Sequence, residues 1–267
     1  DPTSLPSPGN WEANLGSQDL EGLRVAVVPN LGGVTLEDGV EQRIRDEAAA
    51  LIADHHMVQV DIDVRPPNLA AQWMMGNLST LLAELGDRWP KCADELTDEV
   101  ASGLIMSQSM YNLRTASVAE ELRVQANQVM ARAFEQVDLI IAASNPGPAF
   151  PAESAMSATE NNLLEKVKAN PVAKVAFRSA LFGTRAVAAV APTVPSKILG
   201  RVSERFPEMV TMGALTIISN IYGNPAVSIP AGTVGGLPVG MQVLAPHHRD
   251  DLLFDVALAV EQERPWP

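Results

Sequence analysis

Four residues stand at positions where an α/β fold usually places its binding sites. Asn145 and Pro146 follow the apolar run 139–143, which is typical of a strand buried on both faces of a sheet. In open α/β sheets, the loops at the carboxyl ends of such strands form the sites. Thr216 and Asn220 precede a second strand-like segment, and both segments should flank the centre of the sheet. We therefore predict that these four residues line one substrate-binding concavity.

A fifth candidate is Arg123, which lies on the segment 117–136 that leads into the buried strand. Apolar residues recur in this segment at helical spacing, which predicts an amphipathic helix. From there the guanidinium can reach the mouth of the same concavity and meet a substrate carboxylate. The alternative is an ion pair with Glu120 on the same helix, which is the commoner outcome for a surface arginine.

The other motifs predict no catalytic residue, no metal site and no cofactor. The chain has no G-x-S-x-G nucleophile turn and no G-x-x-x-x-G-K-[ST] phosphate loop. His55-His56 and His247-His248 are adjacent pairs, whose side chains point apart rather than toward one ion. Cys92 is the single cysteine, and it is either a reactive thiol or, more often in such surroundings, an ordinary buried one.

These residues need a sheet and helices to position them. Short β-branched or alternating runs, a Gly235-Gly236 turn and longer helical periodicities indicate the elements. The predicted strands are 23–30, 57–64, 139–143 and the two arms of a hairpin at 226–244; the predicted helices lie within 35–56, across most of 69–136 and after 250. Pro230 cannot donate to a ladder, which makes the first hairpin arm an edge strand or a bulge. The order predicts an α/β fold with a mixed β-sheet flanked by helices on both faces.

The domain organisation follows from the same pattern. Residues 1–22 are rich in Pro, Gly, Ser and Asn and indicate a linker or surface segment. We expect residues 23–267 to form part of a single domain, with a helical excursion at about 153–215. The chain begins at Asp1 without a methionine, so we expect that a preceding segment was removed.

Charge and composition restrict the partners. The 267 residues carry a net charge of −13, which repels phosphate backbones and anionic membrane surfaces. No apolar run approaches the roughly 20 residues that cross a bilayer. A single cysteine fits a reducing compartment, so we expect a cytoplasmic protein that binds neither nucleic acid nor membrane.

The C-terminal stretch NIYGNPAVSIPAGTVGGLPVGMQVLAP resembles the corresponding end of the amidase signature family. The family reads Asn-x-x-Gly-x-Pro-Ala-x-Ser-x-Pro-x-Gly, then Gly-Leu-Pro-x-Gly-x-Gln, then a helix that ends near Arg-Pro-Trp. The matching residues are Asn220, Gly223, Pro225, Ala226, Ser228, Pro230, Gly232, Gly236, Leu237, Pro238, Gly240 and Gln242. The segments LEGLRVAVVPN and VDLIIAASNPGPAF, and Arg123 fifteen residues before Asp138, also resemble the family. Most of the matched glycines are expected to serve backbone geometry only.

The resemblance implies an enzyme that hydrolyses carboxamide C–N bonds. The family uses two serines and a lysine, which lie in a Gly-Ser-rich signature in its N-terminal half. This chain contains neither a GGSSGGS stretch nor a GSIR-like nucleophile turn. We therefore expect the chain to be the C-terminal half of an amidase, supplying sheet and pocket wall, and to be inactive alone. The alternative is a non-catalytic fragment or pseudo-amidase that acts as a binding module.

The same resemblance bears on the partners. They are expected to be a small-molecule amide and the N-terminal half of the same enzyme, with a homodimer left open. Glutamine-using relatives carry a glutamine-binding acid before the Asn-x-x-Gly motif, and the stretch TMGALTIISN has no such acid. Phe150 and Ile221 are apolar neighbours of the predicted site and favour a hydrophobic amide over glutamine.

Overall fold

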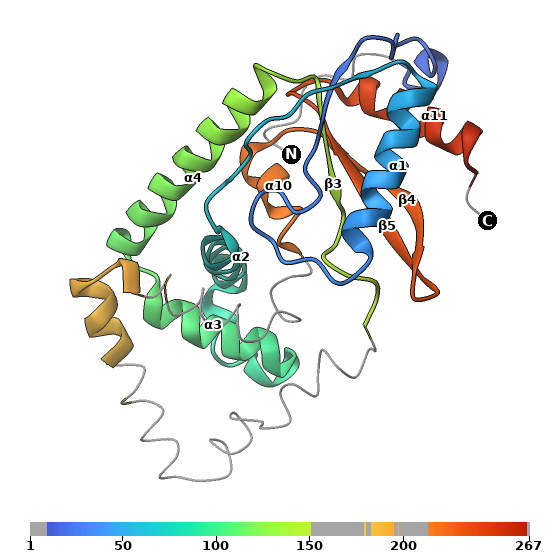
Figure 1. Cartoon of the computed structure of the whole chain (residues 1–267). Coiled ribbons are helices and arrows are strands. Elements are labelled where there is room, and N and C mark those ends of the chain that lie inside the picture. The colour runs from blue at the N-terminus through green and yellow to red at the C-terminus, as the bar shows by residue number, and fades with distance from the viewer. Residues whose placement is uncertain (1–9, 151–178, 180–182, 195–196, 198–212, 266–267) are drawn as a thin grey trace. The chain divides into compact units, whose positions relative to one another are not determined.

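The computed structural model of the protein describes residues 10–150, 179, 183–194, 197 and 213–265 (Figure 1). Its chain divides into two compact units. The first comprises residues 1–66, 126–149 and 213–267, and the second comprises residues 67–125 and 150–212. The elements of the first unit are η1 (Glu12–Asn14), β1 (Arg24–Val27), α1 (Val40–Asp54), β2 (Val58–Gln59), β3 (Leu139–Ala143), α10 (Ile217–Tyr222), β4 (Ala226–Val234), β5 (Leu237–Leu244) and α11 (Asp250–Glu263).

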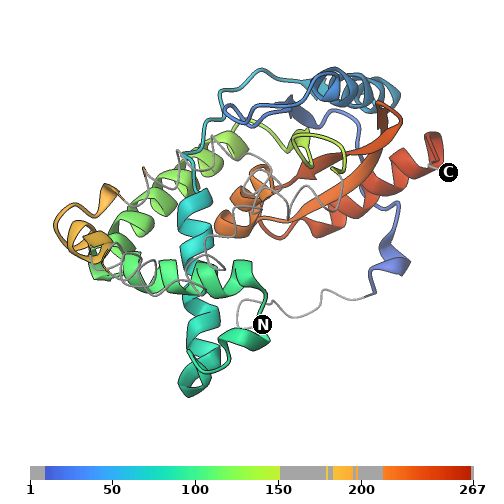
Figure 2. The ribbon, with the colours of Figure 1, turned by 90° about the horizontal axis from the view of Figure 1, so that it is seen from below.

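The first unit is built on one mixed sheet of five strands in the order β2-β1-β3-β5-β4. Strand β1 runs parallel to both β2 and β3, whereas β5 is antiparallel to β3 and to β4. All the segments predicted as strands therefore share a single sheet, and the predicted α/β class is confirmed. Figures 1 and 2 show α1 running alongside the β4–β5 hairpin, with which it is in contact.

Burial along the strands follows from their places in the sheet. The central strand β3 is completely buried, as the continuous apolar run predicted. At the edge, β4 alternates between exposed and buried residues, and the ladder shifts register between Pro230 and Thr233. Pro230 thus lies on an edge strand at an irregularity, which confirms the prediction made from its missing N–H group.

The predicted strand 57–64 is wrong in its length. Only Val58 and Gln59 pair with β1, and both side chains are exposed. The N–H group of Val60 still donates to the Val25 carbonyl at 2.9 Å, after which the chain leaves the sheet. β2 is the outermost strand of the sheet. The polar–apolar alternation in the sequence continues beyond the two residues that pair with β1.

The N-terminal segment is bound to α11 through the buried carboxylate of Asp255. Asp255 accepts hydrogen bonds from the backbone N–H groups of Gly16 and Gln18, both at 2.7 Å. The ring of Trp11 packs against that of Phe254, one residue earlier on the same helix. Residues predicted as a linker or surface segment therefore make specific contacts from residue 11 onward.

The second unit is helical in the residues that the structure describes. Its elements are α2 (Ala70–Leu85), η2 (Gly86–Arg88), η3 (Ala93–Glu95), α3 (Asp98–Met110) and the first part of α4 (Leu113–Phe134), whose residues 126–134 belong to the first unit. Helices α2 and α3 cross in contact with each other (Figure 2), and the predicted helical character of 69–136 is confirmed. Gly103 permits this approach, because a β-carbon there would lie 3.0 Å from the Leu78 side chain.

The predicted excursion at 153–215 lies largely outside the described residues. Within it, residues 183–190 are helical. Two hydrogen bonds tie them to the preceding helices, from Arg114 to the Ala189 carbonyl and from Arg185 to the Gln108 carbonyl.

Candidate functional site

The loop after β3 is held in a defined position. Ser144 is buried, and its N–H group donates to the Gly240 carbonyl at 2.8 Å, which extends the ladder by one residue. The Pro146 carbonyl then accepts from the Glu37 N–H group at 2.9 Å. Asn145 lies between these two anchors and is exposed. The loop is therefore fixed on both sides of the residue that the sequence singles out.

Thr216 directly precedes the short helix α10, and Asn220 lies within that helix. The Thr216 hydroxyl donates to the Gly213 carbonyl at 3.2 Å, and the Asn220 amide donates to the Thr216 carbonyl at 3.2 Å. Asn220 is exposed and Thr216 is half-buried, whereas Ile217 and Ile218 are buried beneath them. Their polar atoms are thus ordered by local bonds on the outer side of the helix.

Gln242 connects these two segments. Its buried side-chain amide donates to the Ala143 carbonyl at 3.0 Å and to the Leu215 carbonyl at 2.8 Å. Ala143 ends β3, and Leu215 directly precedes Thr216. Since one nitrogen binds both carbonyls, the loop with Asn145 and the start of α10 meet at the same end of the sheet.

A pair of hydroxyl groups lies beside this junction. The Oγ atoms of Ser144 and Ser228 are 2.5 Å apart. Gly240 lies against both: a β-carbon there would approach Ser144 Oγ to 2.8 Å and Ser228 Oγ to 3.1 Å. Ser228, Gly240 and Gln242 match the C-terminal motif in the sequence, but no role in the site was predicted for them. Their positions within that motif were the available signal.

Arg123 belongs to the second unit, where it forms an ion pair. Its Nη2 lies 2.7 Å from the Glu120 carboxylate, three residues earlier on α4, and both side chains are largely exposed. This bond holds the pKa of Glu120 below its ordinary value, while the same carboxylate raises the pKa of Arg123. The described contacts of Arg123 thus match the alternative stated for it from the sequence, an ion pair with Glu120.

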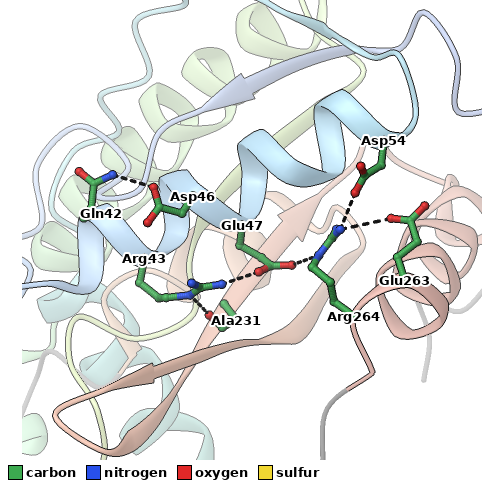
Figure 3. Close-up of polar contacts among 8 residues, drawn as sticks. All are labelled: Gln42, Arg43, Asp46, Glu47, Asp54, Ala231, Glu263 and Arg264. Carbon is green, nitrogen blue, oxygen red and sulfur yellow. Dashed lines mark hydrogen bonds and ion pairs between the residues drawn. The ribbon is translucent and has the colours of Figure 1, made fainter.

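A second charged cluster joins α1, β4 and the end of α11 (Figure 3). The buried carboxylate of Glu47 receives hydrogen bonds from Arg43 at 2.6 Å and from Arg264 at 2.5 Å. Arg43 also donates to the Ala231 carbonyl on β4, and Arg264 also reaches Asp54. Two arginines therefore neutralise one buried acid, as burial of a carboxylate requires.

A third ion pair links the starts of β1 and β3. Asp138 accepts from the Arg24 backbone N–H group at 2.9 Å and pairs with its guanidinium at 2.8 Å. These bonds lower the pKa of Asp138, although partial burial opposes the shift. They lie at the amino ends of the two strands, away from the loop that follows β3.

The described part of the chain contains neither a cluster of metal-ligating side chains nor a membrane-spanning helix. Among those residues, no three His, Cys, Asp or Glu side chains come together as metal ligands would. His55 directly follows the last residue of α1, and His247 Nε2 lies 2.8 Å from the Tyr222 carbonyl. None of the helices described here combines the length and apolar character needed to cross a bilayer.

The mixed five-stranded sheet and the helices packed against it define the chain as an α/β protein. A family model described as Amidase matches residues 1–254, so the chain belongs to the amidase family, as the C-terminal motif indicated. A glutamyl-tRNA(Gln) amidotransferase subunit from Streptomyces avermitilis is 27% identical over 271 aligned positions, covering 91% of this chain and 44% of that protein. Its counterpart from Clostridium kluyveri is 38% identical over 82 residues, which cover 30% of this chain and 16% of that protein.

Solved structures agree in fold. A bacterial aryl acylamidase superposes with a TM-score of 0.66 at 15% identity, covering 100% of this chain and 48% of that one. A 6-aminohexanoate cyclic dimer hydrolase gives 0.64 at 20% identity, with 98% and 49% covered. The chain thus spans about half the length of the long-matching relatives and of these two structures.

Proposed function

We propose that this chain is the C-terminal half of an amidase that hydrolyses carboxamide C–N bonds to a carboxylate and ammonia or an amine. The carrying observation is the Gln242 junction, which joins the loop after β3 to the start of α10 in a chain of the amidase family. In this proposal, Asn145 and Pro146 on one side of the junction and Thr216 and Asn220 on the other supply the wall of the substrate pocket.

The nucleophile and its base come from the N-terminal half in this proposal. A Ser-Ser-Lys arrangement would activate one serine through the second serine and a neutral lysine, while backbone N–H groups hold the oxyanion. The support in this chain is that its sequence lacks a GGSSGGS stretch and a GSIR-like turn, whereas its C-terminal motif is present. The chain then contributes binding and shape rather than bond cleavage, in a cytoplasmic enzyme.

The proposed substrate is a small hydrophobic amide. The half-buried Ile221 follows Asn220 on α10, and TMGALTIISN contains no acid to receive the α-amino group of glutamine. The amidotransferase relatives are named for a glutamyl-tRNA substrate, but the net charge of −13 offers tRNA no attractive surface. Arg123 is proposed as a substrate contact that exchanges its exposed Glu120 partner for a substrate carboxylate.

The test compares this chain with the natural polypeptide that includes the preceding half. Both are assayed on small aliphatic and aryl amides and on glutamine. The longer protein should hydrolyse the hydrophobic amides, and residues 1–267 alone should show only the background rate. Turnover by the short chain that survives repurification would contradict the proposal. Binding without turnover in the longer protein would favour the alternative, a non-catalytic binding module.

A further inference from the structure

We propose that Gln242 is a positioning residue, whose buried amide sets the separation between the loop after β3 and the start of α10. The inference rests on the proposed function, because those two segments are the walls of the proposed pocket. Gln242 itself is 2% exposed and therefore does not touch substrate. It acts through the backbone that carries Asn145 on one side and Thr216 on the other.

The two hydrogen bonds of Gln242 join parts of the chain that are far apart in the sequence. The Ala143 carbonyl is 99 residues away in the sequence and the Leu215 carbonyl is 27 residues away. An amide nitrogen has two hydrogens, so one side chain can donate to both carbonyls at once. A buried carbonyl without a donor is unfavourable, so losing this amide would penalise both segments in their present positions.

The location of Gln242 on β5 explains why the amide can reach both segments. In the sheet Gln242 pairs with Ala142 on one side and Ser228 on the other. Side chains that are paired across strands leave the same face, and both neighbours are small. The long amide side chain therefore has room beside them, and the backbone at Leu215 lies over this same face.

The nearby hydroxyl pair acts on only one of the two walls. Ser144 and Ser228 join the loop to β4, and the Ser144 N–H group joins it to β5. Neither bond reaches α10. The bonds from Gln242, by contrast, reach both walls, because their acceptors are the Ala143 and Leu215 carbonyls.

The experiment uses Gln242→Met in the natural full-length protein, because methionine keeps the side-chain length and removes the donors. The matched control is Gln136→Met, since Gln136 donates from the same kind of amide to the Arg132 carbonyl, but locally and at the surface. Amide hydrogen exchange is measured for residues 144–148 and 214–222. We expect about tenfold faster exchange there in Gln242→Met, the factor that corresponds to the loss of one or two net hydrogen bonds. Strands β1 and β3 should be unchanged, and the control should match the wild type throughout.

Kinetics on a series of amides separates positioning from general stability. Loss of pocket geometry should raise KM by about three- to tenfold, differently for each amide, while kcat stays within about twofold. A uniform fall in active protein would lower the apparent kcat of every substrate equally and would overturn the inference. Unchanged exchange in residues 144–148 and 214–222 would overturn it as well.

A second variant and the exchange measurement cover the cases in which Gln242→Met does not fold or the wild-type protein is inactive. If Gln242→Met does not fold, Gln242→Asn retains the amide but withdraws it by one methylene, and the same exchange pattern is expected in weaker form. If the wild-type protein hydrolyses no amide, the proposed function fails. The exchange measurement then decides by itself whether Gln242 couples the two segments.

Discussion

The hydroxyl oxygens of Ser144 and Ser228 lie 2.5 Å apart, although 84 residues separate them in the sequence. Ser144 follows the last residue of the central strand and Ser228 lies on the edge strand, so the pair spans β5 between them. They can approach because the β5 residue that lies against both is Gly240, which has no side chain. The absence of a β-carbon at Gly240 therefore allows the hydroxyls of Ser144 and Ser228 to meet across β5, beside the proposed pocket.

The first prediction concerns Gly240→Ala. The added β-carbon would lie 2.8 Å from Ser144 Oγ and 3.1 Å from Ser144 Cβ, closer than packed atoms tolerate. We expect a loss of about 1–3 kcal/mol in the free energy of unfolding, as is typical of overpacking. Urea denaturation measures it.

A control variant and a double-variant background test the cause of the expected loss in stability. Gly33→Ala is the control, because a β-carbon at Gly33 meets nothing within 4 Å, and its stability should stay within about 0.5 kcal/mol of the wild type. In a background with Ser144→Ala and Ser228→Ala, the cost of Gly240→Ala should fall. An equal cost in both backgrounds would show that the hydroxyls are not what the added carbon meets.

The second prediction concerns the buried carboxylate of α1. Glu47→Ala leaves Arg43 and Arg264 without their shared acceptor, and we expect a loss of about 3 kcal/mol in the free energy of unfolding. The control is Glu41→Ala on the same helix, which removes an exposed partner of Arg45 and should cost about 0.3–0.5 kcal/mol. Thermal and urea unfolding of the two variants should differ clearly; equal losses would mean that the Glu47 cluster contributes no more than a surface pair.

The third prediction concerns acid stability. Arg24 lowers the pKa of Asp138 below its ordinary value of 3.8 in the folded protein. The folded state therefore binds this proton less readily than the unfolded state, so the pair stabilises the fold above about pH 4. That contribution should disappear as the pH falls through the lowered pKa of the folded protein. Asp138→Asn should reduce the melting temperature at neutral pH and lose less stability than the wild type on acidification.

Arg24→Gln provides the check on that interpretation. It removes the guanidinium while leaving the carboxylate in place, so it should also flatten the acid limb of the stability profile. Adding Asp138→Asn to it should then have little further effect, because the two residues act as one pair. Parallel pH profiles for the wild type and both variants would refute the assignment.

The fourth prediction concerns substrate preference in the full-length enzyme. Asn145→Ala and Arg123→Ala should each change the ranking of amides by kcat/KM when the amides differ in polarity or carry a carboxylate. A lost substrate contact of this kind changes kcat/KM by about tenfold or more. Arg45→Ala is the control for Arg123, because Arg45 is also an exposed arginine paired along its own helix. An unaltered ranking in both variants would make these residues structural.

Local sequence patterns were sufficient for much of the fold. The apolar run 139–143 identified the buried central strand, and the Gly235-Gly236 turn identified the hairpin. Pro230 identified the edge strand through its missing N–H group. These features depend on periodicity, turn geometry and hydrogen-bonding capacity, which neighbouring residues express by themselves. Strand 57–64 was overestimated because alternation does not reveal where a partner strand ends.

The motif at the C-terminus determined the family, but it left the roles of its members undecided. Only the tertiary structure showed that Gln242 joins Ala143 to Leu215, and that Arg264 reaches Glu47 across 217 positions of the sequence. No local pattern encodes such contacts, because each depends on how distant segments pack once the sheet has formed. The sequence therefore determined which residues stand at the ends of strands and helices, and the packing of those elements decided which of them touch.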